Sequence, residues 1–515
     1  MISDLQGQGA VEAQADFIVI GAGTVGLPTC VRLAQKTGKH VVCLESGGYR
    51  QAEETHPLNE VVHVASRYDG AMHGRFRCLG GTSTRWGGAL IPFQSADVEE
   101  DGWPIPMADL EPYVTDVEEL FGLEPGPYSD PFFPFDIGET HVNRLAKWPP
   151  FKRRNVVDLV GKECRTLANL NVWLNATVVA IQAGTDGTGV EVQAQSPSGD
   201  TIRLAAARLI VAAGAIETTR LALLIDQQSG GAVRALSPSL GRYFADHISV
   251  GIADIEPRKP KALNKIIGFR FSGGGCMRNL RFEFASDAAA RKSLPPCFAD
   301  VRFELQQPGG FEALREVLRG AQKQQLPSAA VCRSLVRHLP WLLRAAWWRF
   351  VHKRLLFPAH ARLTVHTVIA QTSNADNTIR LSETRRDPFG VPLAEIRWRV
   401  SDKDIDNVEG AADLMEKMWR GSDFAAHGVW QRIASETVAT RAREAGAFLH
   451  PTGSTRIGRD ADEGVVDRDL HVFAMPQIQL LSTSVLPTPG GANPTMMLMM
   501  LALRCIDQHA RACIE

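Results

Sequence analysis

The sequence predicts an α/β protein with two or more lobes, and three observations support this class. Its 515 residues exceed what one simple core holds, since domains usually run to roughly 100–200 residues. Near the N-terminus a glycine-rich turn follows an apolar strand, which is how a βαβ unit begins. Near the C-terminus a further strand leads into a long apolar helix. We therefore expect a Rossmann-like parallel sheet accompanied by a second, α+β lobe.

The composition is that of an ordinary globular protein, with 44% hydrophobic and 22% charged residues and a net charge of −1. Without a basic excess, the sequence indicates no nucleic-acid partner. Its 9 cysteines form no CxxC pair and no metal-ligand spacing, which predicts reduced thiols in the cytoplasm and no metal site. The polar N-terminus predicts no signal peptide. The longest apolar run, "MMLMMLAL", is shorter than the ~20 residues of a transmembrane helix.

The stretch "DFIVIGAGTVGLPTCVRLAQKTGKHVVCLES" predicts the first βαβ unit. Its strands are Phe17–Ile20 and Val41–Leu44, and between them lie Gly21, Gly23 and Gly26, then a helical pattern. Such glycines let a pyrophosphate approach backbone N–H groups at a helix start. Glu45 follows the second strand. A carboxylate at this place accepts hydrogen bonds from both hydroxyls of an adenosine ribose and repels a 2′-phosphate. This predicts an adenine dinucleotide other than NADP, and leaves NAD and FAD open.

Two later segments favour FAD. The stretch "RCLGGTSTRWGGALIPF" (77–93) is dense in small residues, so its backbone amides can lie against a large planar ligand, with Trp86 available to pack. The segment around Val178 and Ala213–Gly214 then places further backbone beside an adenine or ribose. Nicotinamide domains do not usually return to their dinucleotide so late in the chain, whereas flavoprotein domains do.

The C-terminal stretch "IQLLSTSVLPTPGGANPTMMLMMLALRCIDQHA" adds a helix start to this site. Asn493 is a strong helix cap and Pro494 suits the first helical position. The free N–H groups and positive dipole end of the helix would face the negative pyrimidine side of a reduced flavin. The methionines of the helix are expected to be core.

Taken together, these motifs resemble the glucose–methanol–choline (GMC) family of FAD-dependent oxidoreductases. The matching stretches follow the family's order along the chain: "GAGTVG" with Glu45, "GGTSTRWGG", "AAGAIETTRLAL", "GRYFADH" (Gly241–His247), "HPTGSTRIG", "GVVD" and "NPTMMLMMLALR". The segment 101–123, "DGWPIPMADLEPYVTDVEELFGL", is similar to the branch of bacterial sugar dehydrogenases and pyranose oxidases.

The resemblance implies a function for the site. The family moves a carbinol hydride to the flavin while a base takes the hydroxyl proton, and by resemblance His450 is that base. Asn493 takes the family's second active-site position and would hold the substrate oxygen. The predicted cofactor-binding residues are Gly21, Gly23, Thr24, Val25, Gly26, Glu45, Ser46, Gly81, Thr82, Ser83, Arg85, Trp86, Gly87, Val178, Ala213, Gly214, Asn493, Pro494 and Thr495.

Two positions depart from the family pattern. Pyranose oxidases attach their flavin to the histidine of an "STHW"-like motif, whereas this chain has Arg85 at that place. Arginine cannot form the link, which predicts non-covalent FAD. Ser482 stands where the family commonly has an aspartate, and the sequence gives no reason for this change.

By resemblance, the substrate lobe is built from inserted segments. The expected FAD-binding domain comprises 1–90, 155–255 and 450–515, and the substrate-binding domain comprises 91–154 and 256–449. Within the latter, the pattern around Asp387–Gly390 predicts two antiparallel strands joined by a turn.

Between Val317 and Ala375 the chain has no acidic residue, although basic residues and tryptophans are frequent. One hypothesis is peripheral docking of segment 331–357 on a membrane, an anionic carrier or an electron acceptor. The other is a helical pair, broken at Pro340, that packs over the substrate site. On a helical wheel the basic residues from Arg344 to Arg354 scatter, which disfavours a simple amphipathic anchor.

The sequence thus predicts an enzyme that oxidises an alcohol, expected on a sugar, glycoside or aminosugar, with oxygen or another electron acceptor as partner. Two alternatives remain. One is a flavoprotein of this fold without net redox chemistry, such as a hydroxynitrile-lyase-like enzyme that uses His450. The other is a flavin-binding subunit whose catalytic pair is idle.

Overall fold

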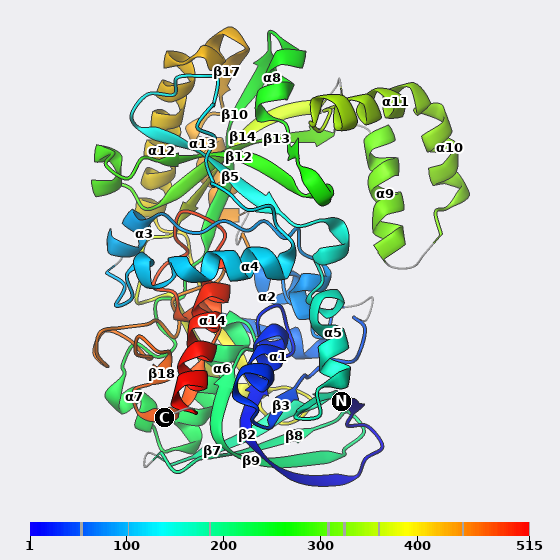
Figure 1. Cartoon of the computed structure of the whole chain (residues 1–515). Helices are drawn as coiled ribbons and strands as arrows, with labels where there is room; N and C mark the ends of the chain where they lie inside the picture. The colour runs from blue at the N-terminus through cyan, green and yellow to red at the C-terminus, as the bar shows by residue number, and fades with distance from the viewer. Residues whose placement is uncertain are drawn as a thin grey trace.

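In the computed structural model, two sheets lie one above the other, and the chain crosses between them several times (Figure 1). The structure describes residues 1–51, 55–100, 102–184, 187–305, 309–322, 326–358, 361–444 and 448–513. Each sheet has a hydrophobic core of its own. The α/β fold class is confirmed, with a Rossmann-like parallel sheet in one part and an antiparallel sheet in the other.

The lower sheet in Figure 1 has nine strands, and its central strands run parallel. The buried run 17–20 pairs with 41–44 and with 208–211 on its other side. The strands, in spatial order, are β1 (Ile2–Asp4), β6 (Leu170–Leu174), β3 (Val41–Leu44), β2 (Ala10–Ile20), β9 (Thr201–Val211), β19 (Met475–Leu480) and β18 (His471–Val472), with β7 (Thr177–Ala183) and β8 (Val190–Gln195) pairing antiparallel beside β9.

Two helices from opposite ends of the chain cover one face of this sheet. Helix α1 (Gly26–Thr37) contacts both α14 (Thr495–Ala512) and α5 (Val156–Thr166), and the methionines of α14 are buried, as predicted. Helix α6 (Ala215–Gln228) follows β9 and is buried over most of its length. Because β2 leads into α1, β9 into α6 and β19 towards α14, three strand ends meet at one edge of the sheet.

The upper sheet has seven strands, and its recorded pairings are all antiparallel. It consists of β5 (His141–Trp148), β11 (Arg270–Phe271), β12 (Met277–Phe284), β13 (Cys297–Leu305), β14 (Ala361–Ala370), β10 (His247–Pro257) and β17 (Gly428–Arg432). Helices α8 (Pro260–Ile267), α12 (Asp402–Gly421) and α13 (Ser435–Glu444) contribute side chains to its core.

The predicted hairpin around the Asp387–Gly390 turn is confirmed. Strands β15 (Thr378–Arg386) and β16 (Pro392–Arg397) pair antiparallel, and β4 (Val61–His63) adds a parallel third strand. Four short helices lie elsewhere in the chain: α2 (Gly70–His73), α3 (Ser95–Glu100), α4 (Val114–Phe121) and α7 (Ala232–Leu236).

Three helices form an arm that stands away from the upper sheet (Figure 1). They are α9 (Gly310–Gln322), α10 (Ala329–Arg337) and α11 (Leu339–Trp347), and a π-helical turn (Trp348–His352) follows. Pro340 lies in the first turn of α11, as expected of a helical pair separated near this residue. Lys323, one of the basic residues between Val317 and Ala375, lies outside the described residues. Within the described part of the chain, no helix combines the length and apolarity needed to cross a membrane.

Candidate active site

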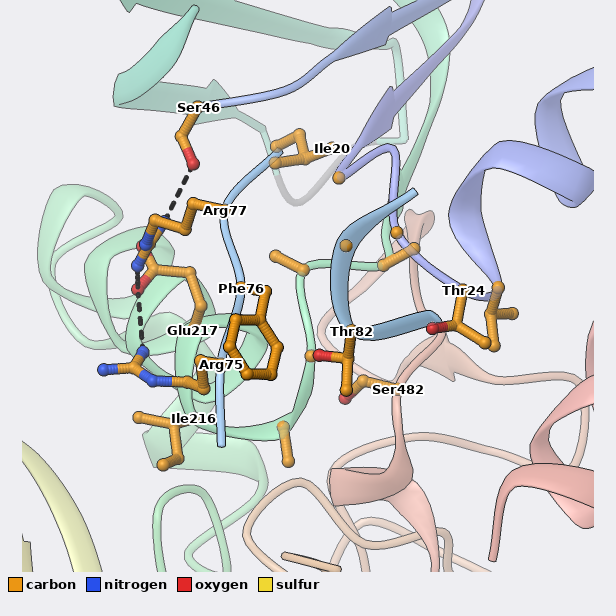
Figure 2. A pocket seen from close by; sticks show the side chains of 18 of the residues that line it. Ile20, Thr24, Ser46, Arg75, Phe76, Arg77, Thr82, Ile216, Glu217 and Ser482 are labelled. Atoms are coloured by element: carbon orange, nitrogen blue, oxygen red, sulfur yellow. Dashed lines mark hydrogen bonds and ion pairs between the residues drawn. The ribbon is translucent and has the colours of Figure 1, made fainter. Parts of the chain in front are cut away.

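A cavity of about 250 Å³ lies at the carboxyl ends of the parallel strands. Parallel α/β sheets bind nucleotides at this edge, because strand ends and helix N-termini meet there. Most of the predicted cofactor residues line its wall: Gly21, Gly23, Thr24, Val25, Glu45, Ser46, Gly81, Thr82, Trp86, Val178, Ala213, Gly214 and Thr495. Figure 2 shows the wall from close by, with Thr24 and Thr82 towards one side and Ser46 towards the other.

The glycines of the first turn fit a dinucleotide. Gly21 has a φ of 103°, and a Cβ there would lie 2.6 Å from the Ala212 carbonyl oxygen. A Cβ on Gly26 would lie 1.9 Å from the Gly21 carbonyl oxygen, so α1 approaches the turn this closely only with glycine. At Gly23 and Gly214 a Cβ would meet nothing within 4 Å, which shows that these two positions face open space. The turn therefore has the shape of a pyrophosphate cradle.

Glu45 is buried at the end of β3, and backbone amides hold its carboxylate. Oε2 accepts a hydrogen bond from the Ala22 N–H at 2.9 Å, and Oε1 accepts one from the Gly47 N–H at 2.9 Å. Burial raises the pKa of Glu45, although these two amides and Arg77 act in the opposite direction. Because each carboxylate oxygen has further acceptor capacity, both remain suited to ribose hydroxyls.

Six predicted cofactor residues do not line the cavity: Gly26, Ser83, Arg85, Gly87, Asn493 and Pro494. Two of these shape the second glycine loop instead. The Ser83 hydroxyl donates to the Gly80 carbonyl at 2.6 Å and accepts from the Val156 N–H at 3.1 Å. Arg85 donates to the Gln51 side chain at an exposed position.

Sequence reasoning missed a charged cluster on the cavity wall. Arg77 donates to Ser46 Oγ at 3.0 Å and to Glu217 Oε2 at 2.8 Å, and Arg75 lies on the other side of Glu217 (Figure 2). Burial opposes ionisation of Glu217, but Arg77, Arg220 and Arg75 outweigh it and lower its pKa to about 2. The alternating arginines of "RFR", directly before the second glycine loop, were the available sequence indication.

The structure brings together His450 and Asn493, the two predicted catalytic residues. The Asn493 Nδ2 group lies 3.1 Å from His450 Nε2. Leu449 and Pro451, on either side of His450, both line the cavity. Leu449 has a φ of 66°, which is uncommon for a residue with a side chain and is found near functional sites.

Asn493 does not cap helix α14, contrary to the sequence prediction. The helix begins at Thr495, its N-cap residue is Pro494, and no side chain caps it. The Asn493 side chain is instead engaged at both ends, because Oδ1 accepts from the Arg281 guanidinium at 2.5 Å while Nδ2 reaches His450. The prediction failed because a tertiary contact competed with the local capping bond.

A directed chain of hydrogen bonds fixes the tautomer of His450. His247 Nε2 lies 2.8 Å from the Gly490 carbonyl oxygen, and a carbonyl only accepts, so Nε2 carries hydrogen. Burial lowers the pKa of His247 to about 4, so its ring is neutral and its Nδ1 must accept. His450 Nδ1 lies 3.1 Å from that atom and therefore donates. His450 Nε2 therefore carries the lone pair, which accepts a hydrogen bond from the Asn493 amide at 3.1 Å in this structure and can take a proton from a substrate that displaces it.

The surroundings of His450 also keep its ring neutral. Burial, followed by the neighbouring His247 and Arg281, lowers the pKa of His450 well below 6.5. Arg281 is buried on β12 of the upper sheet, and its guanidinium carbon lies 4.1 Å from the Phe298 ring centroid. A neutral imidazole whose basic nitrogen faces only the Asn493 amide, with both chain neighbours on the cavity wall, is suited to work as a general base.

Asp246, another residue missed from the sequence, holds the backbone of both histidines. Its Oδ1 accepts from the N–H of His247 at 2.6 Å and from the N–H of His450 at 2.9 Å. Its Oδ2 accepts from the Tyr68 hydroxyl at 2.6 Å. Burial raises the pKa of Asp246 to about 7. Asp246 and His247 end the motif "GRYFADH", whose resemblance to the family pattern was the available sequence indication.

Comparisons with known proteins show similarity to GMC oxidoreductases. Residues 373–502 match the family model described as GMC oxidoreductase. A 6'''-hydroxyparomomycin C oxidase of Streptomyces lividus is 30% identical over 142 residues, a match that spans 28% of this chain and 24% of that enzyme's length.

Longer matches cover nearly the whole chain. A protein of Rhodococcus erythropolis described as an uncharacterized GMC-type oxidoreductase is 25% identical, over 95% of this chain and 97% of its own length. The crystal structure of a pyridoxine 4-oxidase from Mesorbium loti has the same fold, with a TM-score of 0.59 and 14% identity over 96% of this chain and 99% of that one. The chain is thus similar to GMC oxidoreductases, through the family model over residues 373–502 and through a relative that matches nearly its whole length.

Proposed function

We propose that the protein oxidises an alcohol CH–OH group with FAD, and that His450 is the base. The observation that carries this proposal is the hydrogen-bond chain that leaves a lone pair on Nε2 of a neutral His450, beside the dinucleotide cavity. GMC oxidoreductases bind FAD, and the glycine turn and Glu45 fit its ADP half.

The residues would divide the work as follows. FAD, when bound, supplies the acceptor for the carbinol hydride. His450 Nε2 takes the hydroxyl proton, and its Nδ1–H bond to His247 keeps the ring oriented while the charge forms. Asn493 offers its amide to the substrate oxygen, with Arg281 holding the other end of that amide.

We propose a sugar, glycoside or aminosugar as the substrate. The similarity of one stretch to a hydroxyparomomycin C oxidase supports this choice. We also propose two domains, a substrate domain of 91–154 and 256–449 and a FAD-binding domain of 1–90, 155–255 and 450–515. The two-part construction of the site supports this division, because Arg281 comes from the upper sheet and Asn493 precedes α14. Strand β10 belongs to the upper sheet, which favours a boundary before His247 rather than after residue 255. Oxygen or another acceptor would reoxidise the flavin.

We also propose that the flavin is held without a covalent bond. The position that carries the linking histidine in pyranose oxidases is Arg85, which is exposed, bonded to Gln51 and absent from the cavity wall. Acid precipitation of the purified protein should leave all yellow colour in the supernatant. A pellet that stays yellow after washing would contradict this proposal.

The first experiment is an anaerobic visible spectrum before and after a pool of sugars, glycosides and aminosugars is added. Bleaching of a bound-flavin spectrum would support alcohol oxidation. His450→Ala should keep the oxidised flavin spectrum and lower the rate of bleaching about 10²–10⁴-fold, which is what a general base contributes. His40→Ala is the control, because His40 directly precedes β3, at the amino end of the sheet away from the cavity. An unaffected His450→Ala variant would refute the assignment.

A further inference from the structure

The outer surface of the helical arm is apolar, although the segment stands out in the sequence for its basic residues. Along α11 and the following turn, Leu339, Leu343, Trp347, Phe350 and Val351 are all exposed, with Trp347 and Phe350 at 60% and 70% of their full accessibility. Residues at these spacings share one side of a helix. Exposed apolar stripes of this kind mark interaction sites.

The opposite side of the same helix is the one that packs. Trp348 is buried, and the Trp341 ring contacts Phe311 of α9. The Arg349 guanidinium lies 3.6 Å from the Phe271 ring centroid, and Arg354 donates to the Lys265 carbonyl at 2.6 Å. Two of the basic residues that scattered on the helical wheel therefore anchor the arm to the body. Because these two side chains turn towards the body, they do not cover the exposed apolar side chains of the outer face.

The exposed charges on α10, on α11 and directly after the π-helical turn are positive. Arg333, Arg337, Arg344 and Lys353 are exposed, and none of their side chains has an ion-pair partner among the described residues. No acidic residue occurs between Val317 and Ala375 that could neutralise them locally. An apolar face with tryptophan and phenylalanine, bordered by unpaired lysine and arginine, is the pattern of a helix that lies in a membrane interface.

We propose that the arm α9–α11 docks the protein on the surface of an anionic lipid bilayer. Trp347, Phe350 and their apolar neighbours would enter the headgroup region, while the four basic side chains remain among lipid phosphates. A second copy of the chain is a poorer occupant, because a symmetric contact would bring the same positive charges together. This proposal is independent of the proposed catalytic function.

Vesicle sedimentation with the full-length protein tests the proposal. The wild type should sediment with vesicles of phosphatidylcholine containing phosphatidylglycerol, bind pure phosphatidylcholine at least tenfold more weakly, and lose affinity as salt is added. Trp347→Ser combined with Phe350→Ser should reduce binding to anionic vesicles at least tenfold. Phe132→Ser combined with Leu236→Ser, which alters exposed apolar residues elsewhere, should not.

Two charge-reversal substitutions on the arm measure how much the basic side chains contribute to vesicle binding, apart from the apolar face. Arg337→Glu with Arg344→Glu should weaken anionic-vesicle binding at least tenfold, whereas Arg203→Glu with Arg380→Glu, at exposed positions outside the arm, should change it less than threefold. Wild-type protein that stays in the supernatant with anionic vesicles would overturn the proposal. So would light scattering that shows a dimer which the Trp347/Phe350 variant dissociates, because the face would then be covered by a second copy.

Discussion

At the residue scale, His247 decides which nitrogen of His450 carries hydrogen. His247 Nε2 must donate to Gly490, so its Nδ1 accepts and forces the proton of His450 onto Nδ1. His247 is not among the residues that line the cavity, and its ring nitrogens are engaged by Gly490 and His450, so it acts through His450 as a positioning residue. Its contribution is a tautomer rather than a contact with substrate.

This role predicts different results for two substitutions of His247. His247→Gln supplies an oxygen that accepts from His450 and an amide that donates to Gly490, so it should keep kcat within several-fold of the wild type. His247→Leu removes the acceptor and should lower kcat about 10–100-fold, the value of a hydrogen bond to a charged group. Steady-state kinetics with the flavin content as control would measure both. Equal losses in the two variants would show that only packing matters.

The pKa of His450 predicts the pH dependence of catalysis. A base works in its neutral form, and burial with its neighbours lowers the pKa of His450 well below 6.5. The ratio kcat/KM should therefore stay level as pH falls to 6.5 and decline only below it. Asp246, with a pKa raised to about 7, titrates nearby, so Asp246→Asn is the control that should leave the acid limb in place. A limb at or above pH 6.5 that persists in this variant would contradict the assignment.

At the scale of elements, the sequence pattern correctly predicted those strands and turns that depend on neighbouring residues alone. The strands 17–20 and 41–44 and the glycine turn before α1 lie where the sequence placed them, because apolar runs and glycines act on their own neighbourhood. Strand β2 is longer than predicted, since residues 10–16 extend it with polar residues whose pairing with β9 the pattern did not reveal. The cap predicted at Asn493 was wrong because Arg281 and His450 compete for the same side chain.

Replacing either of two glycines of the first turn by alanine should have different effects, on protein stability at Gly26 and on FAD binding at Gly23. Gly26→Ala would place a Cβ against the Gly21 carbonyl and should destabilise the flavin-free protein by about 1–3 kcal/mol. Gly23→Ala meets only open space and should leave that stability within about 0.5 kcal/mol, yet weaken FAD binding at least tenfold because the methyl enters the cradle. Urea unfolding of apoprotein and FAD titration measure the two effects. Equal stabilities of both variants would refute this account of the turn.

At the scale of the whole molecule, the site depends on contacts that no single segment encodes. His450 meets His247 and Asp246 across about 200 positions of sequence, and Asn493 meets Arg281 across a similar separation. The family resemblance located His450 and Asn493, because those residues lie within motifs. Arg281 lies on β12, between the buried residues Leu280 and Phe282, where the sequence shows only an ordinary alternating strand. Three-dimensional assembly was needed to reveal its place.

Arg281 couples the upper sheet to the catalytic pair, because its guanidinium donates to the Asn493 side chain that reaches His450. Nε and Nη1 of Arg281 are buried without a hydrogen-bond partner in the described structure, and only Nη2 is bonded, to Asn493. A buried charge that is poorly paired contributes little to stability, so Arg281→Met should leave Tm within a few degrees of the wild type or raise it. The same change releases the Asn493 amide and should lower kcat/KM about 10–100-fold.

Arg220→Met is the contrasting variant. Arg220 is buried with two ionic partners, Glu217 at 3.0 Å and Asp387 at 2.6 Å. Its loss leaves the buried Asp387 carboxylate without an ion-pair partner, while Glu217 keeps Arg77 and Arg75, and should cost about 3–5 kcal/mol. If Arg281→Met unfolded as readily as Arg220→Met, Arg281 would be a structural residue. If it stayed folded and kept full kcat/KM, the orientation of Asn493 would not depend on it. A stable variant with impaired kcat/KM would show that the upper sheet uses its buried cation to hold the substrate-binding amide.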